Sequence, residues 1–78
     1  MKQSLGGTIR KIRNEKKMTQ AKLAQICNLD EDYVSKIERG VRQPSLHTLF
    51  AIADALNTPL ASIIKEVDIL RKQLSKTT

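Results

Sequence analysis

The chain has almost no aromatic residues and a single cysteine. Of its 78 residues one is Tyr, one is Phe and none is Trp, so the core must be built from aliphatic side chains. Cys27 alone excludes an internal disulfide, and with one histidine and no CxxC pair there is no set of ligands for a zinc site. We therefore expect a protein without metal or other cofactor, working in a reducing, cytoplasmic setting.

Long apolar runs are also absent. No segment approaches the roughly 18 apolar residues of a membrane span. The N-terminal stretch "MKQSLGGTIRKIRNEKK" has no apolar run of signal-peptide length. These absences predict a soluble protein with no membrane partner.

Residues for catalysis are scarce as well. His47 stands alone, and Gly6 and Gly7 are not followed by the Lys and Ser or Thr of a phosphate-binding loop. No nucleophile and base stand out as a pair, and Cys27 is best interpreted as a buried small apolar residue. We therefore predict that the protein is not an enzyme.

Basic residues, in contrast, are abundant. Fourteen Lys and Arg oppose eight Asp and Glu, which gives a net charge of +6. This excess indicates an anionic partner, either nucleic acid or an acidic lipid surface.

The apolar pattern is helical throughout. Apolar side chains recur at helical spacing, as in Leu5, Ile9 and Ile12, and alternation typical of strands is absent. The helices are predicted at residues 5–17, 20–27, 31–39, 46–56 and from 59 onward. The N-cap candidates are Thr19, Asp30 and Ser45, and helices are expected to end at Asn28, Gly40 and Asn57. Leu46, Leu49, Ala53 and Leu56 form one apolar stripe of the fourth helix.

The second and third helices are too short to be stable alone, so they must dock on each other. Ala24 is small enough to let them cross closely, and Leu29, Val34 and Ile37 would fill the angle between them. Two short helices joined by a turn of about three residues are typical of a helix-turn-helix, here at 19–39.

The segments "TQAKLA", "VSKIERG", "PSL" and "IADALN", in this order and spacing, resemble the Cro/lambda-repressor (XRE-like) helix-turn-helix family over about residues 5–64. Within that family, "LDEDYVSKIERG" is most similar to the controller proteins of restriction-modification systems. The resemblance implies an all-α, five-helix lambda-repressor-like DNA-binding domain, at residues 1–64. The chain departs from the family pattern at Asn28, where Gly is usual, and at the acids at positions 31 and 32.

The third helix should present one face to DNA. At about 100° per residue, Val34, Ile37 and Glu38 fall on one side, and Asp32, Ser35, Lys36 and Arg39 fall on the other. Because the N-terminal part of such a helix enters the major groove, Asp32 and Ser35 would approach base edges. Glu31 and Tyr33 flank this face, and Tyr33 could contact DNA or cover the edge of the core.

The acids of this helix have two possible roles. Glu31 and Asp32 lie at the positive end of the helix dipole, where a carboxylate stabilises the helix. Either could also accept a hydrogen bond from the N4 amine of a cytosine. Such an acid would repel phosphate at every site, so it would raise discrimination more than affinity.

Further contacts are implied by the resemblance. Gln20 matches a glutamine that contacts the DNA backbone and supports the recognition helix, and Thr19 and Arg42 match phosphate-contact positions. Arg13 and Glu38 match a pair that bridges the first and third helices. A structural ion pair is therefore expected there.

The C-terminal helix, at about 59–75, extends beyond the family domain. Its apolar residues follow a heptad spacing, and Ile64 lies beside the seam formed by Leu60, Ile63, Val67, Leu70 and Leu74. Ile63 and Ile64 are expected to serve the monomer core, with Ile63 also at the start of the dimer seam. Phe50 is either a core aromatic or an interface residue. The exposed part of the seam predicts a homodimer.

These observations predict a transcriptional regulator, a repressor or activator, that binds double-stranded DNA at an inverted repeat as a homodimer. The alternative is an antitoxin-type protein, which would bind a partner protein through the C-terminal helix and regulate its own promoter.

Overall fold

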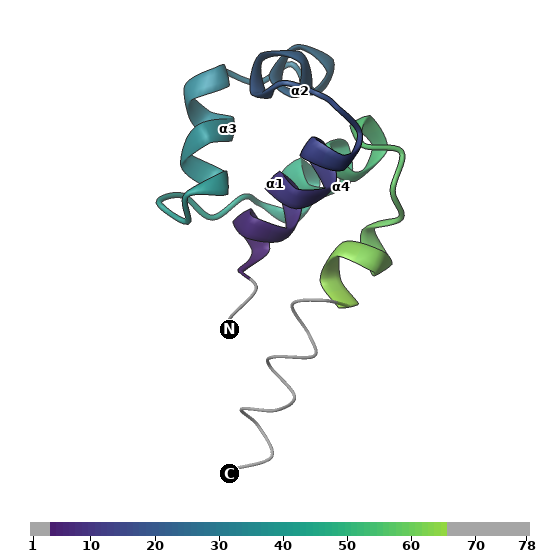
Figure 1. Cartoon of the computed structure of the whole chain (residues 1–78). Helices are drawn as coiled ribbons and strands as arrows, with labels where there is room; N and C mark the ends of the chain where they lie inside the picture. Colours follow the sequence, from purple (N-terminus) through teal and green to yellow (C-terminus); the bar gives the residue numbers. More distant parts are fainter. Residues whose placement is uncertain (1–3, 66–78) are drawn as a thin grey trace, which may run out of the picture.

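The computed structural model describes residues 4–65, and this part of the chain is helical (Figure 1). The helices are α1 (Leu5–Glu15), α2 (Gln20–Cys27), α3 (Glu31–Glu38) and α4 (Leu46–Ala55), and residues 60–65 are also helical. No strand forms within residues 4–65, as expected for the predicted all-α class. Within the same range, no helix is long and apolar enough to cross a membrane.

The predicted N-caps are confirmed. The Thr19 hydroxyl accepts a hydrogen bond from the Lys22 N–H at 3.0 Å, and the Asp30 carboxylate accepts one from the Asp32 N–H at 2.9 Å. Ser45 caps α4 in the same way. Each cap contributes about 1 kcal/mol to stability, because it satisfies a backbone donor at the start of the helix.

The four labelled helices end in the same way. Each is followed by a residue with a left-handed backbone, and these residues are Lys17, Asn28, Gly40 and Asn57. The next N–H then donates to the carbonyl five residues earlier, in the pairs Met18–Arg13, Leu29–Ala24, Val41–Lys36 and Thr58–Ala53. This hydrogen bond is the mark of a Schellman ending. The chain therefore turns sharply after each of these four helices.

Three helices end earlier than predicted. Helix α1 stops at Glu15 rather than at residue 17, because Lys17 takes a φ of 57° and cannot continue the helix. Helices α3 and α4 each end one residue early, with Arg39 and Leu56 as their C-caps.

The core is aliphatic, as the composition predicted. Helix α2 packs against both α3 and α4, and α1 packs against α3. The buried apolar side chains that form this core are Ile9, Leu23, Ala24, Val34, Ile37, Ile52 and Leu56. The predicted stripe of α4 is wrong at Leu46, which lies in the first turn, remote from the core, and is exposed.

A glycine allows the close crossing of α1 and α3. A Cβ atom added at Gly6 would clash with the carbonyl oxygen of Ile37 and would lie 2.7 Å from that of Glu38. Both atoms belong to the backbone and cannot move aside. The two helices can approach this closely only because residue 6 has no side chain.

Candidate nucleic-acid interface

Helix α3 has one buried and one exposed face. Val34, Ile37 and Glu38 are buried, with at most 7% of each residue exposed. Asp32 and Arg39 lie on the opposite side and are exposed, while Ser35 and Lys36 are half-buried. The helical wheel drawn from the sequence therefore describes this helix correctly.

A buried ion pair holds α3 against α1. The Arg13 guanidinium donates to Glu38 through Nε at 2.6 Å to Oε2 and through a terminal nitrogen at 3.0 Å to Oε1. A further Arg13 nitrogen donates to the carbonyl of Met18 at 2.7 Å. Because the pair is bidentate and buried, it fixes the orientation of both side chains. Glu38 thus faces the protein interior, away from the exposed face of α3.

Gln20 belongs to the same network. Its Nε2 donates to Glu38 Oε1 at 3.0 Å, so the first residue of α2 is tied to the end of α3. Thr19 precedes it and is exposed, with its hydroxyl occupied as the N-cap. The start of α2 is therefore tied to α3, as the resemblance implied for a supporting glutamine, and Gln20 also lines one hollow with Asp32 and Ser35 of the exposed face.

The polar side chains on the exposed face of α3 are paired with one another. Lys36 Nζ lies 3.0 Å from Asp32 Oδ2, one helical turn away. Arg39 Nε donates to the Ser35 hydroxyl at 3.3 Å. Both contacts join residues four apart, the spacing at which helical side chains meet. Neither pair was predicted, although the spacing of four residues is visible in the sequence.

Tyr33 lies between the core and the surface. It is half-buried and packs against the core, and the Arg42 guanidinium lies 5.9 Å from the centre of its ring. This distance is within the range of a cation–π contact. The ring thus supports Arg42, which is exposed in the loop after α3. Sequence patterns gave no signal for this contact, because it depends on how the loop folds back.

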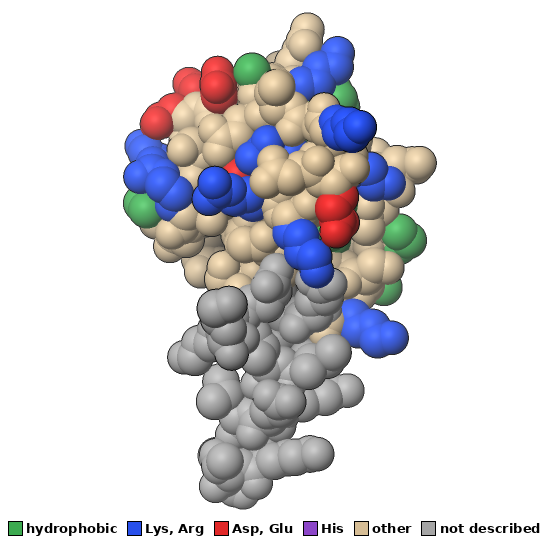
Figure 2. All heavy atoms as spheres, in the orientation of Figure 1, with side chains coloured by type: hydrophobic (Ala, Val, Ile, Leu, Met, Phe, Trp, Pro, Cys, Tyr) green, Lys and Arg blue, Asp and Glu red, His purple; other side chains and the backbone are tan. Residues whose placement is uncertain are grey.

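Acidic and basic side chains lie close together on this side of the molecule. Figure 2 shows acidic side chains gathered at the upper left with Lys and Arg side chains directly below them, and a further acidic side chain at the right among basic ones. A hollow of 430 Å³ at the N-terminal end of α3 is lined by Gln20, Asp30, Glu31, Asp32 and Ser35. Three carboxylates line this hollow, so it disfavours phosphate and favours hydrogen-bond donors.

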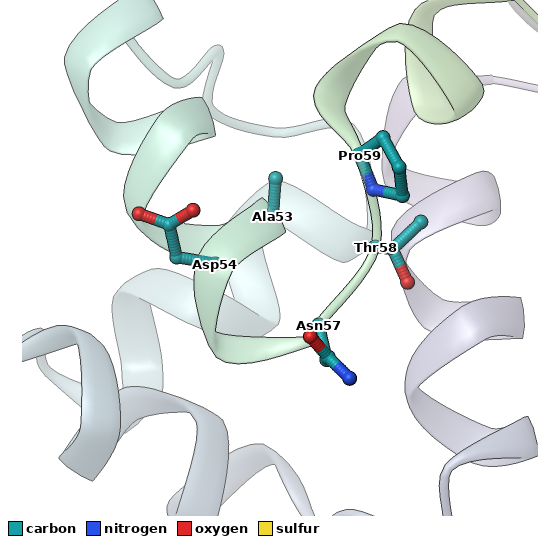
Figure 3. A pocket seen from close by; sticks show the side chains of 5 residues that line it. All are labelled: Ala53, Asp54, Asn57, Thr58 and Pro59. Carbon is teal, nitrogen blue, oxygen red and sulfur yellow. The ribbon is translucent and has the colours of Figure 1, made fainter.

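A second hollow, of 280 Å³, lies at the end of α4. Its lining residues are Ala53, Asp54, Asn57, Thr58 and Pro59. Figure 3 shows Asp54 on one side of it and Thr58 and Pro59 on the other, with Ala53 between them. Asp54 is the only charged residue of the lining. The hollow therefore offers no cationic group to bind a phosphate.

Cys27 lies near α4 and is only half-buried. Its thiol donates to the Ala51 carbonyl at 3.5 Å. Burial raises the pKa of this thiol, and the negative charge of Asp54 raises it further. The thiol is therefore kept in its neutral form. The prediction that Cys27 is buried is wrong, because the side chain lies at the end of α2 and remains partly exposed. Within residues 4–65, no cluster of three or more His, Cys, Asp or Glu side chains could hold a metal ion.

The predictions for the dimer interface that fall within residues 4–65 differ in outcome. Ile63 is fully buried, so it serves the monomer core and has no surface left for a second copy. Ile64 was expected in the core but is 41% exposed, and Phe50 is 52% exposed and not a core aromatic. Val67, Leu70 and Leu74 lie outside the described residues.

Comparison with known proteins gives matches over most of the chain. The sequence profile of a helix-turn-helix family matches residues 9–63. The chain is 39% identical over 70 residues to the immunity repressor protein of Bacillus phage phi105, an alignment that covers 90% of this chain and 49% of the repressor. It thus spans about half the length of that protein. Control protein C.SmaI of Serratia marcescens is 32% identical over 73 residues, which cover 94% of this chain and 87% of C.SmaI.

Solved structures agree with these matches. The restriction-modification controller protein C.Esp1396I, determined as a tetramer in complex with its natural 35 base-pair operator, is 39% identical. It superposes with a TM-score of 0.71 over 81% of this chain and 88% of its own.

Proposed function

The chain belongs to the helix-turn-helix family of the Cro/lambda-repressor type, and on that premise we propose that it is a sequence-specific regulator of transcription that binds an inverted-repeat operator as a homodimer. The observation that carries this proposal is the exposed face of α3. Its buried side is held by Val34, Ile37 and the Arg13–Glu38 pair, so the opposite side is presented rigidly to a partner. A rigid helix with polar side chains on its outer face suits reading of the major groove.

In this proposal the residues divide by role. Asp32, Ser35 and Lys36 approach base edges, while Glu31 and Tyr33 flank them. The residues that position the DNA backbone are Thr19, Gln20, Arg39 and Arg42. Arg39 and Arg42 are exposed at the C-terminal end of α3 and in the following loop. Phosphate contacts of this kind fix the register of the protein on the duplex without reading sequence.

The basic surface supports binding to a polyanion. The chain carries a net charge of +6 despite the three acids at the start of α3. If about six basic side chains meet phosphates, log affinity should fall against log salt with a slope of about −5, at roughly 0.9 per contact.

Exposed apolar side chains support the dimer. Leu46 and Phe50 lie one turn apart on α4 and are 61% and 52% exposed. Ile64, in the helical stretch that follows, is 41% exposed. Large apolar side chains that remain exposed on a small domain favour burial against a partner. The C.Esp1396I tetramer on its operator is a precedent for assembly on DNA. A two-fold dimer would place two α3 helices about 34 Å apart, one turn of DNA.

The proposed role also bears on location. Access to chromosomal DNA would place the protein in the cytoplasm, where an unpaired thiol such as that of Cys27 remains reduced.

Selection from random duplexes at near-physiological salt, followed by sequencing of the bound pool, tests the proposal. We expect an inverted repeat with half-site centres about 10 bp apart. A pool without any motif, with binding that persists only at low salt, would mean that the surface attracts DNA without reading it. A motif without two-fold symmetry would instead argue against the dimer.

A further inference from the structure

The Asp32–Lys36 pair is the one ion pair on the exposed face of α3 among the described residues. The two charged atoms are 3.0 Å apart, and their side chains are 66% and 43% exposed. An exposed pair at this spacing is weak, because water competes with it. Both groups therefore keep the capacity to form hydrogen bonds with a third molecule.

The position of this pair is fixed by the opposite side of the helix. Val34 and Ile37 are buried in the core, and Glu38 is held by Arg13 and Gln20, so α3 cannot rotate about its axis. The pair therefore presents a negative acceptor and a positive donor side by side at a defined place on the outer face.

This arrangement matches the edge of one base pair. In a C·G pair the N4 amine of cytosine donates in the major groove, and O6 of guanine accepts next to it. Because these two groups are hydrogen-bonded to each other, they lie about 3 Å apart. A carboxylate beside an ammonium at 3.0 Å has the complementary charges at the same spacing.

An A·T pair fits less well, although its N6 donor and O4 acceptor are also neighbours. Beyond O6, guanine offers N7 as a second acceptor for the ammonium, whereas beyond O4 thymine offers a methyl group. On the other side of the adenine amine, N7 would face the carboxylate and repel it. The pair thus discriminates C·G from A·T as well as from the reversed G·C.

We infer that Asp32 and Lys36 act together as the reader of one C·G base pair in each half-site. Asp32 accepts from cytosine N4, and Lys36 donates to O6 and N7 of the paired guanine. This inference rests on the proposed function, since it needs α3 in the major groove. It differs from a cytosine contact by Asp32 alone, because Lys36 reads the guanine of the same base pair.

The test is selection from random duplexes with four proteins: the wild type, Asp32→Ala, Lys36→Ala and the double variant. Both side chains are exposed, so the variants should fold, and circular dichroism checks this. We expect the wild type to prefer C·G at one position of the half-site by at least about fivefold. Each single variant should lose that preference at the same position, and the double variant should lose no more.

Glu31→Ala is the matched comparison, because it removes the same charge from a residue that flanks the base-reading face. It can change the overall affinity, but the preference for C·G at this position should remain. If it abolishes the preference equally, general repulsion explains the effect and the paired readout is wrong. If Asp32→Ala and Lys36→Ala lose base preference at two different positions of the half-site, the inference is also wrong, while the proposed function still holds. Absence of any motif for the wild type would overturn both.

Salt dependence gives a second readout. A lysine that meets a base should leave the salt slope nearly unchanged when it is replaced by alanine. A decrease of about 0.9 in the magnitude of the slope for Lys36→Ala would identify a phosphate contact and contradict the inference.

Discussion

At the scale of single residues, Gly6 is a position with no room for a side chain. A Cβ atom there would clash with backbone carbonyls of α3, whereas at Gly7 it would meet only the Ser4 hydroxyl, at 3.0 Å. Gly6→Ala should therefore lower the free energy of unfolding by about 1–3 kcal/mol, despite the better helix propensity of alanine. Urea denaturation followed by circular dichroism measures this.

Gly7→Ala is the control, since it brings the same gain in helix propensity without a backbone clash. It should lower the free energy of unfolding much less than Gly6→Ala, because only the Ser4 side chain has to shift. Equal stability of the two variants would mean that α1 and α3 are not as close as described.

Cys27 gives a prediction about pH. Its pKa is raised in the folded protein, chiefly by burial and also by the charge of Asp54, so the neutral thiol is favoured. The resulting stabilisation is complete below the pKa of the unfolded chain and is lost as pH rises through the higher folded pKa. Stability should therefore fall at alkaline pH, less so in Cys27→Ala.

Alkylation rates measured against pH test the same group. Iodoacetamide should react with the folded protein at higher pH than with the urea-unfolded chain, because the thiolate is the reactive form. Asp54→Asn should move the folded profile part of the way back. Identical profiles for folded and unfolded chains would contradict the raised pKa.

At the scale of helices, the Arg13–Glu38 pair joins α1 to α3 and, through Gln20, to α2. Glu38→Ala leaves the Arg13 charge buried without its partner, so we expect a loss of about 3–5 kcal/mol. This is a large part of the stability of a chain of this size, which is roughly 4–12 kcal/mol. Chemical denaturation monitored by circular dichroism would measure the loss.

The double variant Arg13→Met/Glu38→Leu tests whether Glu38→Ala is destabilised by the unpaired charge or by the loss of packing. Apolar side chains of similar size leave no unpaired charge, so it should be more stable than Glu38→Ala. A double variant that is less stable than Glu38→Ala would show that packing around the pair matters more than the charge.

Helix positions could be read from the sequence because capping and periodicity are local. Thr19, Asp30 and Ser45 are good N-caps, and Asn28, Gly40 and Asn57 suit a left-handed backbone, so most of the boundaries follow from residue type. The end of α1 could not be predicted in this way. Lysine has no preference for the left-handed region, and Lys17 adopts it where the Arg13 side chain holds the carbonyl of the next residue, Met18.

The candidate site was only partly predictable. The exposed face of α3 follows from periodicity, and the partnership of Arg13 with Glu38 came from the family resemblance. The contact between Arg42 and Tyr33 depends on the path of the loop after α3, which residue spacing does not encode. Exposure of Phe50 and Ile64 also depends on how the whole domain packs, since each lies beside an apolar stripe.

At the scale of the whole molecule, the salt dependence of DNA binding should be traceable to individual basic side chains. Arg42→Ala should weaken binding uniformly across sequences and reduce the salt slope by about one, because it removes a phosphate contact. Tyr33→Phe is its control, since it keeps the ring beneath Arg42 and should keep the slope. An Arg42→Ala variant that loses sequence preference would instead place this residue at a base.

The most direct test of the central claim, that the outer face of α3 is the surface that meets DNA, is to map backbone amide chemical shifts during titration with a selected operator duplex. We predict the largest changes at Thr19 and Gln20, along residues 31–36 and at Arg39 and Arg42, with smaller changes on the outer face of α1. Changes concentrated on α1, with α3 unaffected, would contradict the account.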